Sequence, residues 1–93
     1  MVKLVQISKR GPKNYQLESI YINPKHIIFM AEHRPFQSDL AEGKINLDID
    51  KSATFTKIKL NENSGFSEIV VVGAPELIET KIFTENRKII LRG

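Results

Sequence analysis

Five basic side chains form two groups whose spacing suits contacts with a polyanion. Lys9, Arg10 and Lys13 lie close together in "SKRGPKN", and Lys57 and Lys59 alternate with apolar residues in "TKIKL". Basic grooves with exposed aromatic rings are how many small β-domains hold single-stranded nucleic acid. The aromatic residues that could stack on bases are Tyr15, Tyr21, Phe55 and Phe66. The sequence therefore supports nucleic-acid binding as one function class, although most of these rings are expected in the core.

The positive charge is concentrated at the start of the chain. The net charge is +3 over 93 residues, and residues 1–35 carry six Lys or Arg against two Glu. Such an excess can attract a polyanion, but a net charge of this size is also ordinary for a soluble domain. No RNA-recognition, KH or cold-shock signature accompanies it. Charge alone thus leaves both interpretations open.

The stretch "FSEIVVVGAPELIETKI" combines an apolar strand, a glycine and a helix start, which is how many phosphate-binding loops begin. Such a loop needs several free backbone N–H groups and usually a lysine. Here Pro75 removes one donor, and Glu76 places a negative charge where the phosphate would bind. The five glycines are at least eight residues apart, so neither a GxxxxGK nor a GxGxxG pattern exists. Gly73 is therefore predicted to be a corner between strand and helix.

The sequence contains few residues that could ligate a metal ion or act as a catalytic nucleophile. His26 and His33 are the two histidines, seven residues apart, and a zinc site needs three or four convergent ligands. Ser38, Asp39 and His33 are the residue types of a hydrolytic triad, but closeness in sequence supplies neither an oriented base nor an oxyanion hole. The chain has no cysteine, which excludes disulfides, thiolate ligands and a cysteine nucleophile. We expect neither a metal site nor a triad.

Asp48 and Asp50 form a carboxylate pair in "KINLDID". In a strand they would lie on one face, about 6–7 Å apart, a spacing compatible with acid–base or cation chemistry. Lys44 shares that face, and no glycine-rich ligand loop accompanies the pair, so a solvated outer face is favoured. We therefore expect no catalytic residue, no cofactor, no small-molecule substrate and no enzymatic activity.

The elements that would position these residues are mostly strands, because apolar residues recur with a period of two. Strands are predicted over residues 2–8, 15–22, 54–60 and 66–72, with a hairpin turn at 9–14. The continuous apolar run over 26–31 is predicted to be central in the sheet or covered on both faces. Residues 33–43 show no clear period and are predicted as the longest loop, with one helical turn at 38–42.

Three further segments complete the predicted pattern. "KINLDID" alternates, with Ile45, Leu47 and Ile49 facing the core, so residues 44–72 are predicted to form a three-stranded meander. Proline suits the first position of a helix, and a short helix is predicted near residues 75–83, with an apolar stripe that lies on the sheet. Residues 87–93 are predicted to form a last strand.

Together these elements predict a mainly β (α+β) fold in a single domain of residues 1–93. The sheet is expected to be a small antiparallel β-meander or barrel-like sheet of six to seven strands, with one short helix. No apolar run approaches the length that would span a bilayer, and the first residues lack the pattern of a signal peptide. We expect no membrane insertion and a cytoplasmic location, or the host-cell cytoplasm if the protein is viral.

Several phrases within residues 21–82 resemble the small flagellum-associated FlbD family. They are "YINPKHIIFM", "TKIKLNENSG", the valine strand and "PELIETKI", and the opening "MVKLVQI" is similar to the first strand of that family. The resemblance implies a small sheet capped by a helix and offers no catalytic residue. It extends to core and capping positions, which are Asn23, Ile27, Ile28, Thr56, Ile58, Leu60, Val71, Glu76, Ile78, Lys81 and Ile82. This chain differs by a long insertion at about residues 32–51 and by the C-terminal extension "FTENRKIILRG".

The leading hypothesis from the sequence is a non-enzymatic protein-binding or assembly module. Exposed strand edges, beside "KINLDID" or at the C-terminal "KIILRG", would pair with a protein partner or with a second copy. One alternative is a nucleic-acid-binding module that uses the basic N-terminal turn, with Lys9, Arg10, Lys13, Lys57 and Lys59 as its contacts. A second alternative is an accessory protein of a phage or mobile element, which the isoleucine- and lysine-rich composition would suit.

Overall fold

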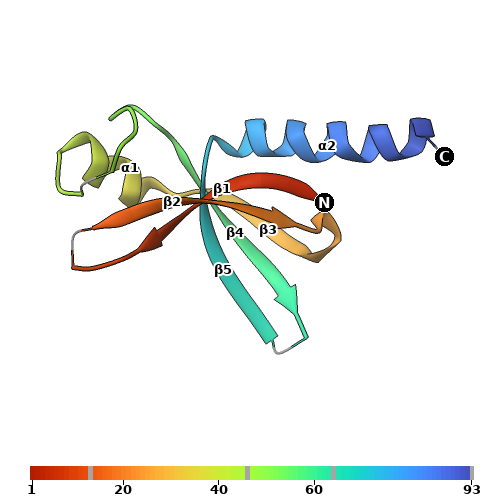
Figure 1. Ribbon diagram of the computed structural model, residues 1–93, viewed down its shortest axis with the longest axis horizontal. Coiled ribbons are helices and arrows are strands. Elements are labelled where there is room, and N and C mark those ends of the chain that lie inside the picture. Colours follow the sequence, from red (N-terminus) through yellow and green to blue (C-terminus); the bar gives the residue numbers. More distant parts are fainter. Residues whose placement is uncertain (13, 46, 64, 93) are drawn as a thin grey trace.

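The computed structural model describes residues 1–12, 14–45, 47–63 and 65–92, and within the last helix it describes side chains as far as Thr84. The elements in chain order are β1 (Val2–Lys9), β2 (Tyr15–Ile22), a 3₁₀ turn η1 (Pro24–His26), β3 (Ile27–Glu32), α1 (Arg34–Ala41), β4 (Phe55–Glu62), β5 (Gly65–Val72) and α2 (Pro75–Arg92). Figure 1 shows strongly twisted strands, with α1 and α2 toward opposite ends of the long axis of the molecule.

The described strands form one antiparallel sheet in the order β2-β1-β5-β4-β3. β2 and β3 are the outer strands, and no pairing joins them within the described residues, so the sheet is open. The prediction of a mainly β, antiparallel fold is confirmed. The prediction of a barrel-like sheet with six to seven strands is not, because the described part of the chain contains five strands in an open sheet.

The apolar run over 26–31 forms an outer strand, so its predicted central position is wrong. β3 pairs with β4 alone, in a register that shifts between Ile27 and Phe29. Ile27 and Met30 pack against the core, whereas Ile28 and Phe29 are exposed. The reason is the pairing order: β5 lies between β1 and β4, which leaves β3 with a single neighbour.

The segment "KINLDID" forms no strand among its described residues, and that prediction is also wrong. Backbone bonds turn it locally, because the Lys44 N–H donates to the Asp39 carbonyl (2.8 Å) and the Ile49 N–H donates to the Leu47 carbonyl (2.9 Å). The alternation nevertheless identified the side chains that face the core, since Ile45, Leu47 and Ile49 are half-buried and pack against a core cluster. Period-two hydrophobicity thus indicated which residues face the core, while the local turns replaced ladder pairing.

Helix α1 occupies a segment that was predicted as a loop with one helical turn. Pro35 lies in the first turn, where a missing N–H is tolerated. Leu40 is buried and Phe36 packs against the same cluster, so one face of the helix lies on the sheet. Gln37 fastens the helix to β4, because its Oε1 accepts a hydrogen bond from the Phe55 N–H at 3.0 Å.

Helix α2 begins at Pro75 as predicted but continues to Arg92, beyond the predicted end at residue 83. The predicted last strand over 87–93 is therefore wrong for residues 87–92, and Gly93 lies outside the described residues. No glycine or proline occurs between Pro75 and Gly93 to stop the helix. The two strand edges that the sequence suggested for assembly are thus absent from the part of the chain that the structure describes.

Two apolar clusters lie on opposite faces of the sheet, because successive side chains of a strand point to opposite sides. The first cluster, packed under α2, contains Val2, Leu4, Ile22, Ile58, Leu60, Val71 and Ile78. The second contains Ile7, Leu40 and Phe55 and is covered by α1 and the segment that follows it. Four core positions that the family resemblance includes, Ile58, Leu60, Val71 and Ile78, are buried in the first cluster.

The sheet has a weak seam between β1 and β5. Gln6 and Val71 are the one residue pair in the register of these strands, whereas β1 with β2 and β4 with β5 each pair over eight residues. Side chains bridge the seam instead: Leu4, Val71 and Ile78 are buried together. Helix α2 therefore holds the two halves of the sheet together by apolar contact.

The corner at Gly73 is confirmed. Its φ is +118°, a conformation that residues with a Cβ rarely adopt. The Gly73 carbonyl accepts a hydrogen bond from the buried hydroxyl of Thr56 at 2.7 Å, and its N–H donates to the Thr54 carbonyl at 2.8 Å. These bonds set the direction in which α2 leaves β5, and so they place Ile78 over the seam.

We expect Ile78→Ala to lower the free energy of unfolding by about 2–5 kcal/mol, because a fully buried side chain leaves a cavity at the seam. Leu77→Ala removes the same number of carbon atoms one position earlier, but Leu77 is half-exposed, and we expect about 1 kcal/mol or less. Urea denaturation followed by circular dichroism measures both. Equal losses for the two variants would contradict the role given to the seam.

Candidate functional site

The sheet face opposite α2 carries two phenylalanines and two lysines on neighbouring strands. Cross-strand partners share a face, and Lys59 pairs with Phe29 on one side and with Glu68 on the other. Lys57 and Phe66 lie two residues from Lys59 and Glu68 on their own strands, so they point to the same side. Strands β3, β4 and β5 thus bring Phe29, Lys57, Lys59 and Phe66 together, and we name these four residues the platform.

The two rings of the platform are open to solvent. The exposed fraction is 42% for Phe29 and 70% for Phe66. The Lys59 Nζ lies 5.2 Å from the centre of the Phe66 ring and 6.0 Å from that of Phe29, and the Lys57 Nζ lies 5.9 Å from the Phe29 ring. Each distance is within the range of a cation–π contact. The ammonium groups themselves therefore lie over the rings.

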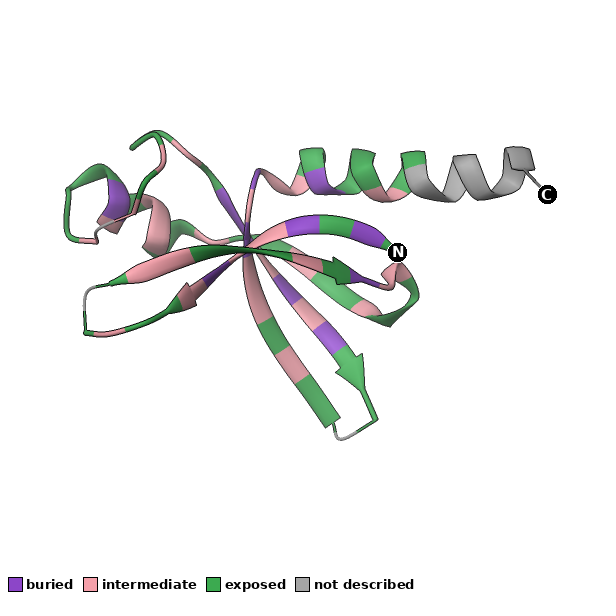
Figure 2. Ribbon diagram, in the orientation of Figure 1, coloured by how far each residue is buried: buried purple, intermediate pink, exposed green. Residues whose placement is uncertain are grey.

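The platform lies on the part of this face that the helices do not reach. α1 and the segment after it cover the second cluster, which includes Phe55, Val70 and Val72 toward the other ends of β4 and β5. Figure 1 shows the tip of the β4–β5 hairpin projecting away from both helices, and Figure 2 shows exposed positions near that tip. The uncovered half is therefore an open, twisted sheet surface with aromatic rings and positive charge.

His33 and Glu68 modify the charge beside the platform. The pKa of His33 is lowered from 6.5, first because partial burial penalises the charged ring and second because Lys57 repels it, while Glu68 acts in the opposite direction. The imidazole is therefore neutral at pH 7. Its ring packs on Phe36, with centroids 4.8 Å apart, and its N–H on the main chain donates to the Phe55 carbonyl at 2.9 Å.

The structure separates the five basic residues that the sequence suggested for nucleic acid. Lys57 and Lys59 lie together on the platform. Lys9 and Arg10 are exposed at the β1–β2 turn, where the Arg10 N–H donates a hydrogen bond to the Asn14 carbonyl at 2.8 Å. Figure 1 shows this turn far from the end of the β4–β5 hairpin. Lys13 lies outside the described residues. The two basic groups therefore do not form one surface.

The suggested aromatic residues also divide by environment. Phe55 is buried, and Tyr15 packs edge-on against Phe36 at 5.2 Å, so neither is free to stack on a base. Tyr21 is exposed on β2, at the edge of the sheet opposite to the platform. Phe66 is one of the four residues of the platform. Phe29 is not among the residues that the sequence suggested, because the continuous apolar run over 26–31 is predicted to be central in the sheet or covered on both faces. The short length of that run between two prolines is the signal that could have indicated an outer strand.

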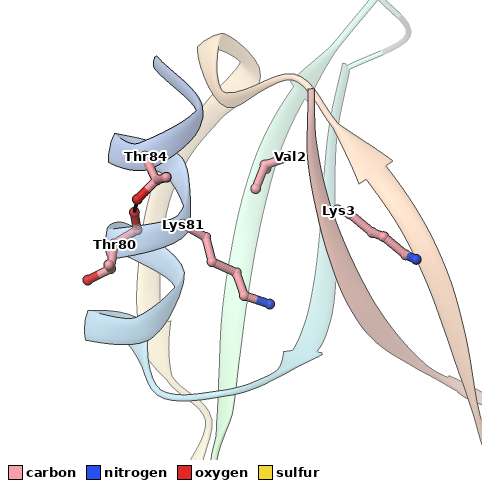
Figure 3. A pocket seen from close by; sticks show the side chains of 5 residues that line it. All are labelled: Val2, Lys3, Thr80, Lys81 and Thr84. Atoms are coloured by element: carbon pink, nitrogen blue, oxygen red, sulfur yellow. Dashed lines mark hydrogen bonds between the residues drawn. The ribbon is translucent and has the colours of Figure 1, made fainter. Parts of the chain in front are cut away.

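A shallow groove lies elsewhere, between the start of β1 and helix α2. It measures about 360 Å³ and is lined by Val2, Lys3, Thr80, Lys81 and Thr84. The hydroxyls of Thr80 and Thr84 donate to helix carbonyls at 2.9 Å, and Figure 3 shows Lys3 pointing away from the helix. Of the two lysines that line the groove, Lys81 is the one whose side chain points into it (Figure 3). A single cation does not form a binding site of convergent groups.

The acidic pair of "KINLDID" has a structural role at Asp50. Its Oδ1 accepts hydrogen bonds from the Ser52 N–H (2.8 Å) and the Ser52 hydroxyl (2.7 Å), and these two bonds, the backbone one foremost, lower the pKa of Asp50. Lys44 forms an exposed ion pair with Glu42 at 2.8 Å. This arrangement stabilises a turn.

The other predicted sites gain no support from the geometry. Within residues 1–12, 14–45, 47–63 and 65–84, no group of three or more His, Asp or Glu side chains could hold a metal ion. Ser38 and Asp39 lie on α1, and in the described hydrogen bonds neither side chain is linked to His33. None of the described helices is both long and apolar enough to cross a membrane.

Comparisons with known proteins identified no relative of this chain. No family model, curated protein or solved structure matches the chain. The resemblance to the FlbD family therefore stays a prediction, and the site is argued from its own geometry.

We expect the titration of His33 to make stability depend on pH. Because folding lowers the pKa of this ring, the unfolded chain binds more protons than the folded chain below pH 6.5. The stability that neutral His33 contributes is thus fully present above pH 6.5 and is lost as pH falls through the lower folded-state pKa. In urea titrations between about pH 7.5 and pH 5.5, His33→Gln should make this decline shallower. His26→Gln, at an exposed position of η1, is the control for loss of a histidine, and the part of the decline that depends on His33 should persist in it.

Proposed function

We propose that this protein is a non-enzymatic module that binds single-stranded nucleic acid on the platform of Phe29, Lys57, Lys59 and Phe66. The observation that carries the proposal is the position of Lys59, whose Nζ lies within 6.0 Å of both exposed rings. Aromatic rings and cations alternate on one open sheet surface. Small β-domains that hold single strands combine these same groups.

The chemistry assigns a separate task to each residue type. The faces of Phe29 and Phe66 offer stacking area to bases, and stacking is tolerant of base identity because every base has a π-face. Lys57 and Lys59 offer ammonium groups to the phosphates, as point charges on flexible stems. Glu68, which pairs with Lys59, reduces the net positive charge and so limits affinity for any polyanion.

A single strand fits this surface better than a duplex. Stacking requires unpaired bases whose faces are accessible, and a duplex buries its base faces within the helix. The platform groups lie on the face of a sheet, where the rings of Phe29 and Phe66 can stack only on bases that are unpaired. The surface suits non-specific contact with a short run of nucleotides.

We expect Phe66→Ala to weaken binding of a single-stranded oligonucleotide by about 5-fold to 150-fold, because one stacked base contributes about 1–3 kcal/mol. The probe is fluorescein-labelled oligothymidine of about 12 nucleotides, within the site size of a small β-domain, and the readout is fluorescence anisotropy. Phe83→Ala is the matched control: Phe83 is 63% exposed, similar to Phe66, but it lies on α2. Equal affinities for the wild type and both variants would contradict the proposal.

The salt dependence tests the lysines separately. Neutralising two phosphate contacts in Lys57→Gln/Lys59→Gln should reduce the slope of log affinity against log salt by about 1.4, at about 0.7 per contact with a single strand. Lys9→Gln/Arg10→Gln removes the same charge from the β1–β2 turn and should leave the slope unchanged. If the turn variant flattens the slope and the platform variant does not, the nucleic acid binds at the N-terminal turn that the sequence suggested.

A further inference from the structure

The outer edge of β2 is open, long and regular. β2 pairs with β1 over all eight residues without a bulge, and no described strand pairs on its other side. Within the strand, Glu18 is the one charged residue and there is no proline. A long edge strand with free backbone N–H and C=O groups is a template for pairing with another strand.

The opposite edge of the sheet is protected in ways that β2 is not. β3 has six residues, and its register is broken between Ile27 and Phe29. Pro24 lies just before it, and an exposed ion pair between Glu32 and Arg34 (3.6 Å) lies at its end. Bulges, prolines and charges are the usual means by which proteins prevent edge-to-edge pairing. The difference indicates β2 as the edge that accepts a partner.

We propose that β2 pairs antiparallel with β2 of a second copy of this chain, about a two-fold axis through Ser19. When two identical antiparallel strands form one continuous sheet, a two-fold axis perpendicular to the sheet relates them. The axis passes beside one residue, which then pairs with the same residue of the second copy. An axis through Glu18 would place two carboxylates directly opposite each other, which is destabilising. An axis through Leu17 or Ile20 would pair a shorter part of the strand.

The axis through Ser19 matches the side chains of the two copies. It places Leu17 of each copy opposite Tyr21 of the other copy. In the single chain the side chain of Leu17 is 37% exposed and that of Tyr21 is 63% exposed. It also separates the two Glu18 carboxylates, each of which then lies opposite Ile20. Aromatic–aliphatic cross-strand pairs stabilise a sheet, and pairing covers apolar surface that a single copy leaves in water.

This pairing is independent of the proposed nucleic-acid site. The platform lies on β3, β4 and β5, at the other edge of the sheet, and it remains open in the dimer. One strand pair makes a small interface, so we expect a dimer of modest affinity that dissociates on dilution.

Disulfide trapping tests the register directly, because the chain contains no cysteine. In Ser19→Cys the introduced thiols of two copies would face each other, with Cβ atoms about 4.5–5.5 Å apart, and a small local adjustment brings them to the separation of a disulfide, about 3.5–4.5 Å. We expect mild oxidation to convert most of this variant to a covalent dimer that a reductant reverses. Ser38→Cys is the control at an exposed serine on α1 and should stay largely monomeric. Equal cross-linking of both variants, or none in either, would overturn the proposal.

Sedimentation velocity over low to high micromolar concentrations tests the dimer without a covalent link. The wild type should shift from monomer to dimer as concentration rises, and Leu17→Lys should remain monomeric over the same range while circular dichroism shows it folded. Ile28→Lys, at the exposed surface of β3, is the matched control and should dimerise as the wild type does. A wild type that stays monomeric, or a dimer abolished by Ile28→Lys instead, would overturn the proposal. Phe66→Ala should sediment as the wild type, so failure of nucleic-acid binding and failure of dimerisation are distinguishable.

Discussion

The fold depends on the burial of one apolar cluster across the seam between β1 and β5. Backbone pairing at this seam is limited to Gln6 with Val71, so the hydrogen-bond ladder alone joins the two halves of the sheet weakly. Leu4 and Val71 approach from the two sides and are covered by Ile78 of α2. Since hydrophobic stabilisation follows the apolar area removed from water, the position of the helix decides whether the sheet holds together.

The position of that helix depends in turn on a few backbone groups at the corner before it. Gly73 adopts a conformation that side chains disfavour, and the buried Thr56 hydroxyl satisfies its carbonyl. A buried carbonyl without a partner would be destabilising, so this bond and the glycine together direct α2 onto the first cluster. The helix therefore covers one face of the sheet, and the other face is left to α1 and its following segment.

The uneven cover of the second face creates the candidate site. α1 and the segment after it protect the cluster around Phe55, but the far halves of β4 and β5 stay open. Phe66 is exposed there, and Lys59 lies over its ring. An exposed aromatic patch favours association with a partner, while the neighbouring lysines favour a partner that is anionic. Base stacking and phosphate contact satisfy both requirements.

Local sequence patterns predicted which side chains of a strand are buried better than they predicted which strands pair with each other. The alternation of Lys57 and Lys59 with Ile58 and Leu60 indicated correctly that the two apolar side chains are buried, although Phe55, on the lysine side of β4, is buried in the second cluster. The alternation in "KINLDID" also indicated correctly which side chains pack against the core, yet that segment turns instead of pairing. A period of two reports which side chains leave water, and it does not report whether a second strand is available for hydrogen bonding.

The sequence by itself determined the corner at Gly73, the start of α2 at Pro75 and the burial of Ile58 and Leu60 on β4. Those features follow from steric limits and side-chain alternation that act over a few residues. Only the tertiary structure decided that β3 is an outer strand, that Phe29 joins Lys57, Lys59 and Phe66, and that Lys9 and Arg10 lie elsewhere. The order of strands in a sheet depends on contacts between segments distant in the chain, and no local pattern contains that information.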